Sequence, residues 1–592
     1  MVDRRRDPWW SSGDERDLWA DALSVYQSLA WRRARWETAL ALCLEQRVTS
    51  LRPGDQQFAD LIGDDWEPLS INAVESVVET LHSRLGATQI KPQIVTSGAG
   101  YEQRRAAQRA DEFIQGAFYS GRVWSDVAPD VLHDILRFGT GIATSWVEEG
   151  ELVFERVRPW ELLVDDVDGA ERRPRTVYRV RWVDRALAAA RWPDEAATIE
   201  AAPAPSGDWA LVDTGARTDV IVVVEGWHLP SGAGAGDGRH TLAVQGALIA
   251  DEEWTESRFP FAVGRYQREP IGWYGRGVPD QLVGLQYDIN ATLLTIRDCH
   301  RFAGMQIFVE RGSRVVKTHL GNEVGAIVEF DGRPPQFFTP QTVHPEQYNW
   351  LATQYQRCFE RAGVSQLASQ AQIPAGLSGA SGKALRTYVA EADSRFTAVL
   401  RDFEDWHCDL ARVAIMALRH AGESVSVISR GKGSIREVRW REVKLEEPYV
   451  VQVLPSSMLP QTVAGRLEAV RDLINDGLAD ALKLDPETIQ RLLNWPDLES
   501  EGLTAGRDAV DEVISAMLDS GTPGVPDSTL DLNVCVAQGI RRYAILVRDG
   551  EDVDSERLAL LRQWIDSARS MLEQAMPEEP AAAPPVPEEV LQ

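Results

Sequence analysis

The stretch of this sequence that most resembles a chemical motif is Gly376-Leu-Ser-Gly-Ala-Ser-Gly382-Lys383. A loop that holds nucleotide phosphates has four residues between its glycines and a serine or threonine directly after its lysine. Here five residues separate Gly376 from Gly382, Ala384 follows Lys383, and no clear strand pattern precedes the loop. The spacing disfavours nucleotide binding and favours a loop of small residues. An ATP-dependent nucleic-acid enzyme that uses this loop is the alternative function.

Other patterns that could place catalytic or metal-binding groups also fail on spacing. Asp166-Val-Asp168-Gly169 resembles a calcium loop, but the first position of that loop would be Val164 and the twelfth Arg175. The nine histidines include no HExxH motif, and no serine lies in a GxSxG motif. Adjacent carboxylates such as Glu148-Glu149 and Asp165-Asp166 stand in turn-like segments, which favour acidic residues anyway. We therefore expect no enzyme activity, no metal and no cofactor.

The size and composition of the chain indicate a protein of several structural units. Its 592 residues exceed what one hydrophobic core usually serves, so about two to four units are expected. No apolar run approaches the roughly 18 residues of a membrane span, and the basic N-terminus lacks the apolar stretch of a signal peptide. These features predict a protein that stays in the cytoplasm, without membrane contact. The five cysteines lie far apart with no CxxC pair, so we expect reduced, mostly buried thiols.

Acidic residues outnumber basic residues by 90 to 62, which gives a net charge of −28. Tight binding of duplex DNA requires lysines and arginines that displace its counterions. The charge balance therefore argues against a protein that grips a DNA sequence. It is compatible with a surface that DNA passes without being held, and equally with a general solubilising charge.

The first part of the chain mixes helix and strand patterns, and it holds fifteen of the twenty tryptophans, all before Pro279. Helical patterns are found at Asp17–Gln46 and Ser125–Arg137. Another helix is expected after Asn72, which can cap it, because Glu75 follows three residues later. Runs rich in alternating and β-branched residues predict strands, and these are Gly141–Val147, Leu152–Val157, Thr218–His228, His240–Ile249 and Phe261–Tyr266.

Two long helices around a short β-like insert are predicted next. Apolar residues at helical spacing indicate a helix over Pro279–Arg301, and a second is expected over His344–Arg361. Between them, Gln306–Glu310 and Ala326–Phe330 have the clearest strand patterns. Two helices on either side of a small β insert predict a helical hairpin that carries the insert at its tip.

The strongest periodic pattern of the chain follows the small-residue loop Gln370–Gly382. From Leu385 to Ala417, apolar residues alternate steps of four and three, which predicts a helix over Ser381–Arg419, about 58 Å long. A helix of that length indicates packing along neighbours; a coiled-coil dimer is the alternative, which polar interruptions disfavour. Short acidic helices are expected next, at Val463–Asn475, Pro486–Asn494 and Ala509–Leu518.

Three motifs are ordered along the chain in a recognisable way. They are Gly272-Trp-Tyr-Gly275-Arg276-Gly277 followed by Pro279-Asp-Gln-Leu-Val-Gly-Leu-Gln-Tyr-Asp-Ile-Asn290, then Ser381-Gly-Lys-Ala-Leu-Arg386, then Met458-Leu459-Pro460 with Arg466, Leu473-Ile474 and Gly477. In this order they resemble the stem junction, the tunnel-loop exit and the start of the crown in the portal proteins of tailed bacteriophages. Arg158-Pro-Trp-Glu-Leu-Leu-Val164 is compatible with the wing of that family.

The resemblance covers nearly the whole chain and implies an α+β, mostly helical portal fold that assembles into a ring. Its regions follow in chain order: a wing (1–276), a stem helix (277–303), a clip (304–342), a second stem helix (343–364), a tunnel loop (365–382), a long wing helix with following strands (383–459), a helical crown (460–576) and a disordered, proline-rich tail (577–592).

The function implied by the resemblance is structural. Portals form a ring, usually of twelve copies, at one vertex of the capsid in the virion, and they assemble in the host cytoplasm. Double-stranded DNA passes through the ring without sequence specificity during packaging and ejection, while the terminase large subunit hydrolyses ATP. Major capsid and scaffolding proteins, head-completion or adaptor proteins and tail proteins are the other expected partners. Another ring-forming or capsid-adaptor component of a phage or gene-transfer particle is a further alternative.

Residue roles follow from the implied tunnel loop and clip. Polar and basic side chains of the loop are expected to make transient phosphate contacts without reading bases; they are Gln370, Gln372, Ser378, Ser381, Lys383 and Arg386. Lys383 and Arg386 would hold positive charge near the channel, although both could equally be ordinary exposed helix residues. The clip is expected to face the terminase or an adaptor with Arg311, Arg314, Lys317 and Glu323.

Overall fold

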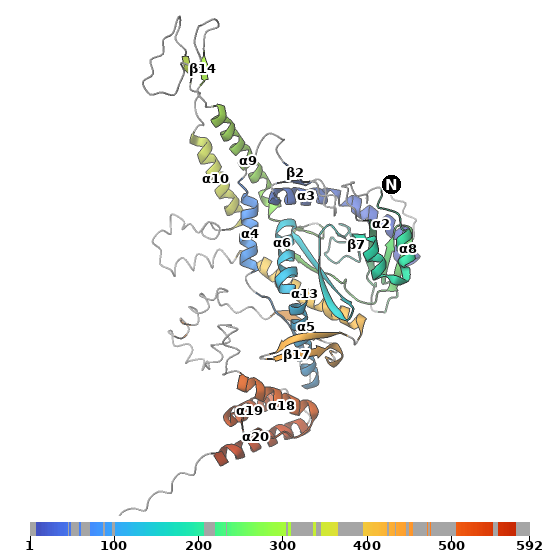
Figure 1. Ribbon diagram of the computed structural model, residues 1–592, viewed down its shortest axis with the longest axis vertical. Helices are drawn as coiled ribbons and strands as arrows, with labels where there is room; N and C mark the ends of the chain where they lie inside the picture. Colours follow the sequence, from blue (N-terminus) through green and yellow to red (C-terminus); the bar gives the residue numbers. More distant parts are fainter. Residues whose placement is uncertain are drawn as a thin grey trace, which may run out of the picture. The chain divides into compact units, whose positions relative to one another are not determined.

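The protein is α+β, with more helix than strand (Figure 1). The computed structural model describes residues 8–44, 46–48, 58–60, 71–86, 89–96, 101–206, 219–270, 272–302, 306–308, 336–338, 345–364, 395–453, 471, 474, 505–548 and 555–575, apart from 233, 423–424, 432–433, 444, 446–448 and 528. The chain divides into two compact units that do not follow chain order. Unit 1 comprises Met1–Ala87, Ser125–Thr144 and Glu155–Trp406, and unit 2 comprises Thr88–Trp124, Ser145–Phe154 and His407–Gln592.

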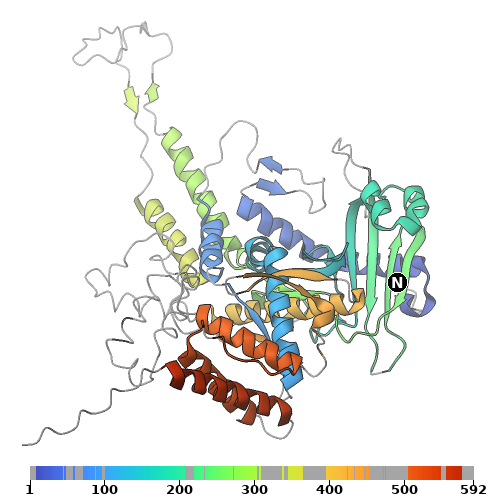
Figure 2. The ribbon, with the colours of Figure 1, turned by 60° about the horizontal axis from the view of Figure 1, so that its bottom comes forward.

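An antiparallel five-stranded sheet forms one end of unit 1 (Figure 2). Its order is β10 (Ala247–Glu253), β9 (Arg239–Val244), β8 (Val220–His228), β7 (Thr176–Asp184) and β6 (Leu162–Leu163). Successive side chains of a strand point to opposite faces. Accordingly, Val222 and Val224 pack in the core that includes α2 (Glu15–Ser28), whereas Ile221 and Val223 pack with α7 (Arg185–Arg191) and α8 (Ala196–Ala201). Both faces of the sheet are therefore covered by helices.

The sheet confirms one strand prediction and corrects another. Strand β8 lies within the predicted Thr218–His228. The single strand predicted at His240–Ile249 is wrong, because β9 and β10 form a hairpin whose turn contains Gly246 at φ +91°. Strand β7 was not predicted, since it places charged side chains in the interior: Arg179 is only 3% exposed and pairs with Glu155 at 2.9 Å.

Glu225 on β8 lies in a buried charge cluster of this sheet. Its carboxylate accepts a hydrogen bond from His240 at 3.0 Å and pairs with Arg181 at 3.3 Å. Burial raises the pKa of Glu225, but the His240 hydrogen bond and the charges of Arg181, His240 and Arg179 outweigh it and lower the pKa to about 2. The cluster therefore stabilises the fold only while Glu225 is ionised.

The Glu225→Gln variant is expected to be less stable than the wild type at pH 7, by on the order of 3 kcal/mol. Because the folded pKa is below the ordinary value of 4.5, this stabilisation is present above about pH 4.5 and is lost as the pH falls through about 2. Urea unfolding from pH 7 to pH 2 measures the difference between the two proteins. Glu253→Gln, at an exposed position of β10, is the matched control. A wild-type advantage that does not shrink with falling pH would contradict the assignment.

Helices α4 (Ala73–Leu85) and α6 (Ala128–Phe138) pack together in unit 1. As predicted, Asn72 caps α4, since its side chain accepts a hydrogen bond from the amide of Glu75 at 2.9 Å. The predicted apolar stripe of α4 is buried, and it consists of Val74, Val77, Val78, Leu81 and Leu85. A π-helical turn at Val123–Val127 precedes α6. After α6 come β4 (Thr140–Glu148) and β5 (Glu151–Val157), and β4 pairs with β11 (Ala262–Arg265); all three strands were predicted.

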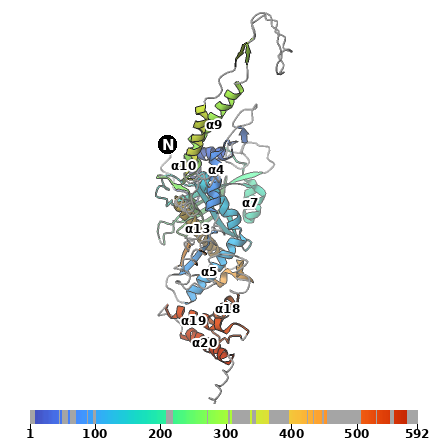
Figure 3. The ribbon, with the colours of Figure 1, turned by 90° about the vertical axis from the view of Figure 1, so that its left-hand side faces the viewer.

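Helices α9 (Pro279–Phe302) and α10 (Pro345–Ala362) pack side by side as a hairpin (Figures 1 and 3). Both helices were predicted, to within a few residues at their ends. Strands β14 (Gln306–Phe308) and β15 (Gln336–Phe338) pair antiparallel between them. Strand β14 was predicted and β15 was not, and the strand predicted at Ala326–Phe330 lies outside the described residues.

Helix α13 (Thr397–Ala421) is the described part of the long helix predicted over Ser381–Arg419. Arg395 and Phe396 form a turn, so α13 begins later than predicted, and residues 381–394 lie outside the described part. The predicted apolar stripe is otherwise buried from Phe396 to Val413. The described helices include none that is long and apolar enough to cross a membrane.

In unit 2, distant segments of the chain pair with each other. Strand β3 (Pro92–Thr96) is antiparallel to β18 (Tyr449–Val453), and α5 (Tyr101–Ser120) packs against β3 and β16 (Ser426–Gly431), which pairs with β17 (Ser434–Arg439). Three helices, α18 (Ala505–Ser520), α19 (Leu532–Arg548) and α20 (Ser555–Ala575), form a cluster (Figure 2). Trp564 is buried in its core. Helix α18 contains the predicted helix Ala509–Leu518. The helix predicted at Pro486–Asn494 and the proline-rich tail lie outside the described residues.

Candidate functional site

All ten residues assigned to the tunnel loop and the clip lie outside the described residues. The loop residues are Gln370, Gln372, Ser378, Ser381, Lys383 and Arg386, and the clip residues are Arg311, Arg314, Lys317 and Glu323. The same holds for the glycine-rich segment that resembles a nucleotide loop. Of the three ordered motifs that resemble the portal family, the structure describes the first in full, namely the turn Gly272–Gly277 and the start of the helix that follows it. The candidate site is therefore the junction between this turn and the helical hairpin.

Three glycines let two backbone segments cross at this junction. A Cβ atom on Gly275 would lie 2.1 Å from the carbonyl oxygen of Gly139, and one on Gly277 would lie 2.4 Å from the carbonyl oxygen of Arg137. Gly139 itself has φ +81° and ends α6. Its neighbour Thr140 accepts a hydrogen bond from the amide of Gly275 at 2.8 Å. The glycines of the motif are therefore required by backbone contact between α6 and the chain that enters α9.

The two aromatic residues of the motif anchor the same turn in the core of unit 1. The hydroxyl of Tyr274 donates to the carbonyl of Leu162 at 2.7 Å and accepts from the amide of Val164 at 3.1 Å. Trp273 is 5% exposed, and its carbonyl accepts a hydrogen bond from Arg265 at 2.7 Å. Burial, with the charges of Arg268 and Arg172, lowers the pKa of Arg265 to about 10, so this arginine stays charged at pH 7. The hydrogen bonds of the Tyr274 hydroxyl and of the Trp273 carbonyl therefore hold the turn in place.

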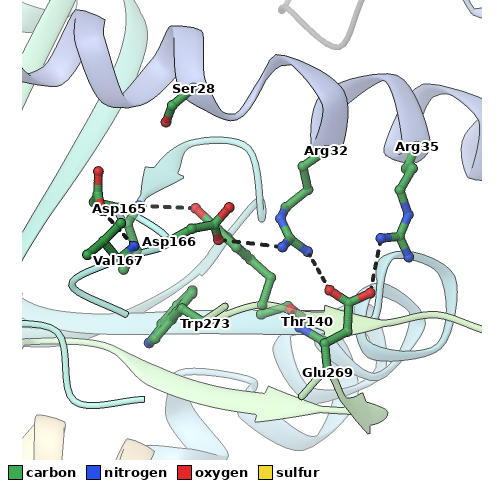
Figure 4. Close-up of polar contacts among 12 residues, drawn as sticks. Ser28, Arg32, Arg35, Thr140, Asp165, Asp166, Val167, Glu269 and Trp273 are labelled. Atoms are coloured by element: carbon green, nitrogen blue, oxygen red, sulfur yellow. Dashed lines mark hydrogen bonds and ion pairs between the residues drawn. The ribbon is translucent and has the colours of Figure 1, made fainter. Parts of the chain in front are cut away.

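An ion network joins α3 (Ala30–Leu44) to Asp166 and Glu269 (Figure 4). Through Asp280 it also reaches the start of α9. Arg32 is 2% exposed and lies 3.5 Å from Asp166 and 3.3 Å from Glu269. Arg35 pairs with the other oxygen of Glu269 at 3.0 Å and with Asp280 at 3.0 Å. A buried arginine needs such partners, because an unpaired charge in the interior is costly.

Asp280 links this network to the glycine turn. It accepts a hydrogen bond from the amide of Gly277 at 3.0 Å, and its own carbonyl accepts one from Arg276 at 3.0 Å. Burial lowers the pKa of Arg35, but hydrogen bonds and charges from Asp280 and Glu269 outweigh it and raise the pKa above its ordinary value. The network therefore fixes the first turn of α9 while Arg35 stays charged.

Local sequence patterns carry little indication of this network, because Arg32 and Arg35 stand more than one hundred residues before their acidic partners. One usable signal was the basic run Arg32-Arg33-Ala34-Arg35 within an acidic chain. An open pocket of about 530 Å³ lies beside the network, lined by Trp31, Arg35, Glu269, Arg276 and Asp280 among others. Its charged groups already pair with one another, so the pocket offers little uncompensated charge to a ligand. The contacts at this junction therefore hold the start of α9 rigidly in place.

The acidic turn Asp165–Asp168 uses its carboxylates for local structure. Asp165 accepts hydrogen bonds from the amides of Val167 and Asp168, at 2.7 and 3.2 Å. Asp168 accepts from the amides of Arg175 and Thr176, at 2.8 and 2.9 Å. These bonds are typical of carboxylates that stabilise turns.

The helical hairpin exposes large aromatic side chains. Tyr287 on α9 is 56% exposed, and Trp350 on α10 is 49% exposed. Tyr348 is 43% exposed and is hydrogen-bonded to His300 across the hairpin. The guanidinium of Arg357 lies 5.7 Å from the ring centroid of Trp350. These side chains give the hairpin an amphipathic outer surface.

The chain matches no model of a known protein family, and no curated protein is similar to it.

Proposed function

We propose that the protein is the portal subunit of a tailed bacteriophage or phage-like particle, which forms a ring at one capsid vertex through which DNA is packaged and ejected. One observation carries the proposal. A glycine-rich turn leads into α9, a paired β14–β15 strand insert follows, and α10 returns against α9. This is the order of stem, clip and stem that the motif resemblance implies.

The charge of the chain supports a conduit over a DNA reader. Duplex DNA carries about one negative charge per 1.7 Å of its axis, so a strongly basic channel would retain it. With a net charge of −28 per chain, the ring would not retain DNA outside a few basic positions, because like charges disfavour association. In this proposal the terminase binds the clip and supplies ATP hydrolysis, and head-completion or tail proteins later bind the same end.

The exposed aromatics of the hairpin support assembly with further copies. Tyr287 and Trp350 each leave about half of their surface in contact with solvent in one chain. Tyrosine and tryptophan are enriched in protein interfaces, where they bury apolar area and keep a polar group paired. Contacts between hairpins of neighbouring copies would cover them.

The purified protein is expected to form rings of about a dozen copies, as the family resemblance implies. Negative-stain images and native mass spectrometry measure the ring and its copy number. The Trp350→Glu variant is expected to shift the population to smaller species, because a charge replaces an apolar contact. Asn349→Glu, at the neighbouring exposed position, adds the same charge and serves as control. A wild-type protein that remains monomeric or dimeric under all conditions would remove the proposal.

The alternative enzyme can be tested with the same material. An ATP-dependent nucleic-acid enzyme would hydrolyse ATP faster when DNA is added, and a Lys383→Ala substitution would abolish that stimulation. The portal proposal predicts no DNA-stimulated ATP hydrolysis by the protein alone. Stimulated hydrolysis that Lys383→Ala removes would favour the enzyme.

A further inference from the structure

Two histidines and a glutamate converge between helices α4 and α6. One potential ligand atom from each of Glu79, His82 and His133 lies within 4.8 Å of the other two. Glu79 and His82 stand three residues apart on α4 and so share one face of that helix, while His133 comes from α6. Both helices belong to unit 1.

The imidazole rings of the two histidines are stacked, and a hydrogen bond fixes which nitrogen of His82 keeps its lone pair. The ring centroids of His82 and His133 lie 3.7 Å apart, with the planes inclined by 13°. Nε2 of His82 contacts the carbonyl oxygen of Pro129 at 3.2 Å. A carbonyl can only accept, so Nε2 carries the proton and Nδ1 of neutral His82 has the lone pair. Metal-binding histidines commonly hold their second nitrogen in this way.

His133 contributes a second unused nitrogen. Its Nδ1 is shielded from solvent and makes no hydrogen bond to any described residue. The nearest carboxylate oxygen, Oε1 of Glu79, lies 3.7 Å away, too far for a hydrogen bond. A buried polar atom without a partner is costly. A cation placed between His133 and Glu79 would satisfy it.

The charges around the cluster allow a divalent cation. Arg137 lies beside it and donates hydrogen bonds to Glu75 at 2.5 Å and to Glu79 at 3.3 Å. Glu75 can therefore neutralise Arg137 when Glu79 turns to a metal. Asp130, on the same helix as His133, adds negative charge and pairs with Arg156 at 3.4 Å.

We propose that Glu79, His82 and His133 form a binding site for a divalent transition-metal cation such as Zn²⁺, which links α4 to α6. Two imidazoles and one carboxylate are a ligand set that Zn²⁺ takes in proteins, with a fourth position left to water. The site has no HExxH spacing because its ligands come from two helices, which is why the sequence predicted no metal.

Isothermal titration of the metal-stripped full chain with Zn²⁺ tests the proposal. One Zn²⁺ per chain is expected to bind, with a Kd on the order of 1 μM or lower. Binding is expected to raise the thermal unfolding temperature, since the cation stabilises only the folded state. His133→Ala and His82→Ala are expected to weaken binding at least about tenfold.

Two controls keep the result interpretable. His420→Ala removes an exposed histidine at the end of α13 and is expected to leave the Zn²⁺ affinity unchanged. Glu79→Gln changes an exposed side chain, so it should fold even if a histidine variant does not, and it is expected to weaken binding too. Co²⁺, used as a spectroscopic substitute, should give a visible absorption band that His82→Ala removes. No Zn²⁺ binding by the wild type, or equal binding by all the ligand variants, would overturn the proposal.

Discussion

Replacing Gly275 by alanine is expected to destabilise unit 1 by about 3 kcal/mol or more. The added Cβ would lie 2.1 Å from the carbonyl oxygen of Gly139 and 3.1 Å from that of Gln267. Both atoms are backbone, so no side-chain rotation can relieve the overlap, and α6 would have to separate from the turn that enters α9. The hydrogen bond from the Gly275 amide to Thr140 would be lost with it. Thermal and urea unfolding, followed by tryptophan fluorescence, measure the loss.

Gly284 provides a control of opposite sign in the adjacent helix. It lies within α9, it is exposed, and no atom comes within 4 Å of a Cβ built there. Gly284→Ala is therefore expected to stabilise the fold by about 0.5–1 kcal/mol, since alanine loses less backbone entropy in a helix than glycine. If Gly275→Ala unfolded at the wild-type temperature or above it, the backbone crossing would not be a constraint.

The turn also connects stability to the proposed function. In the portal proposal, forces on the stem helices must pass into the rest of the subunit. The glycine crossing and the two hydrogen bonds of Tyr274 hold the turn that precedes α9, and the Arg35–Asp280 pair holds its first turn. The Asp280→Asn substitution would leave the fold intact but weaken the attachment of α9 to the rest of unit 1.

Local patterns of the sequence predicted much of the fold. Helices α4, α9 and α10 and strand β8 carry apolar residues at the spacing of their own secondary structure, so a short window identifies them. Strand β7 was not predicted because Arg179 and Arg181 interrupt its apolar pattern. Their burial depends on ion pairs with distant acidic residues, among them Glu155 and Glu225 on other strands. The hairpin of β9 and β10 was merged into one strand because both sides of Gly246 are apolar.

Local sequence patterns predicted the candidate sites even less well than the fold. The Gly272–Gly277 motif could be recognised as a pattern, yet its partners Gly139 and Arg35 lie more than one hundred residues away in sequence, so no short window connects them to it. The Glu79–His82–His133 cluster depends on how α4 packs on α6, a contact that no spacing rule contains. The tunnel-loop and clip residues remain predictions from the resemblance, since they lie outside the described residues.

The double variant Lys383→Ala and Arg386→Ala is expected to reduce DNA packaging or retention by roughly tenfold in an assembled particle. Each cation that contacts phosphate contributes through counterion release, and a ring of twelve copies would lose about two dozen cations at once. Nuclease-protected DNA per particle measures the effect. Lys91→Ala with Arg173→Ala removes the same charge from exposed positions elsewhere and is expected to have little effect. Unchanged packaging by the Lys383/Arg386 variant would exclude this role.

A charge-conserving pair of substitutions separates the channel from the nucleotide loop. If Lys383 and Arg386 act through positive charge near passing DNA, Lys383→Arg with Arg386→Lys keeps that charge and should restore packaging, because phosphate contacts without base readout tolerate either cation. A lysine that reaches the phosphates of a bound nucleotide meets stricter geometry, since the planar guanidinium of arginine differs in size and in hydrogen-bonding directions from an ammonium group. Rescue by the exchanged pair therefore supports a conduit, whereas loss in both variants, together with loss of ATP hydrolysis, would support an enzyme.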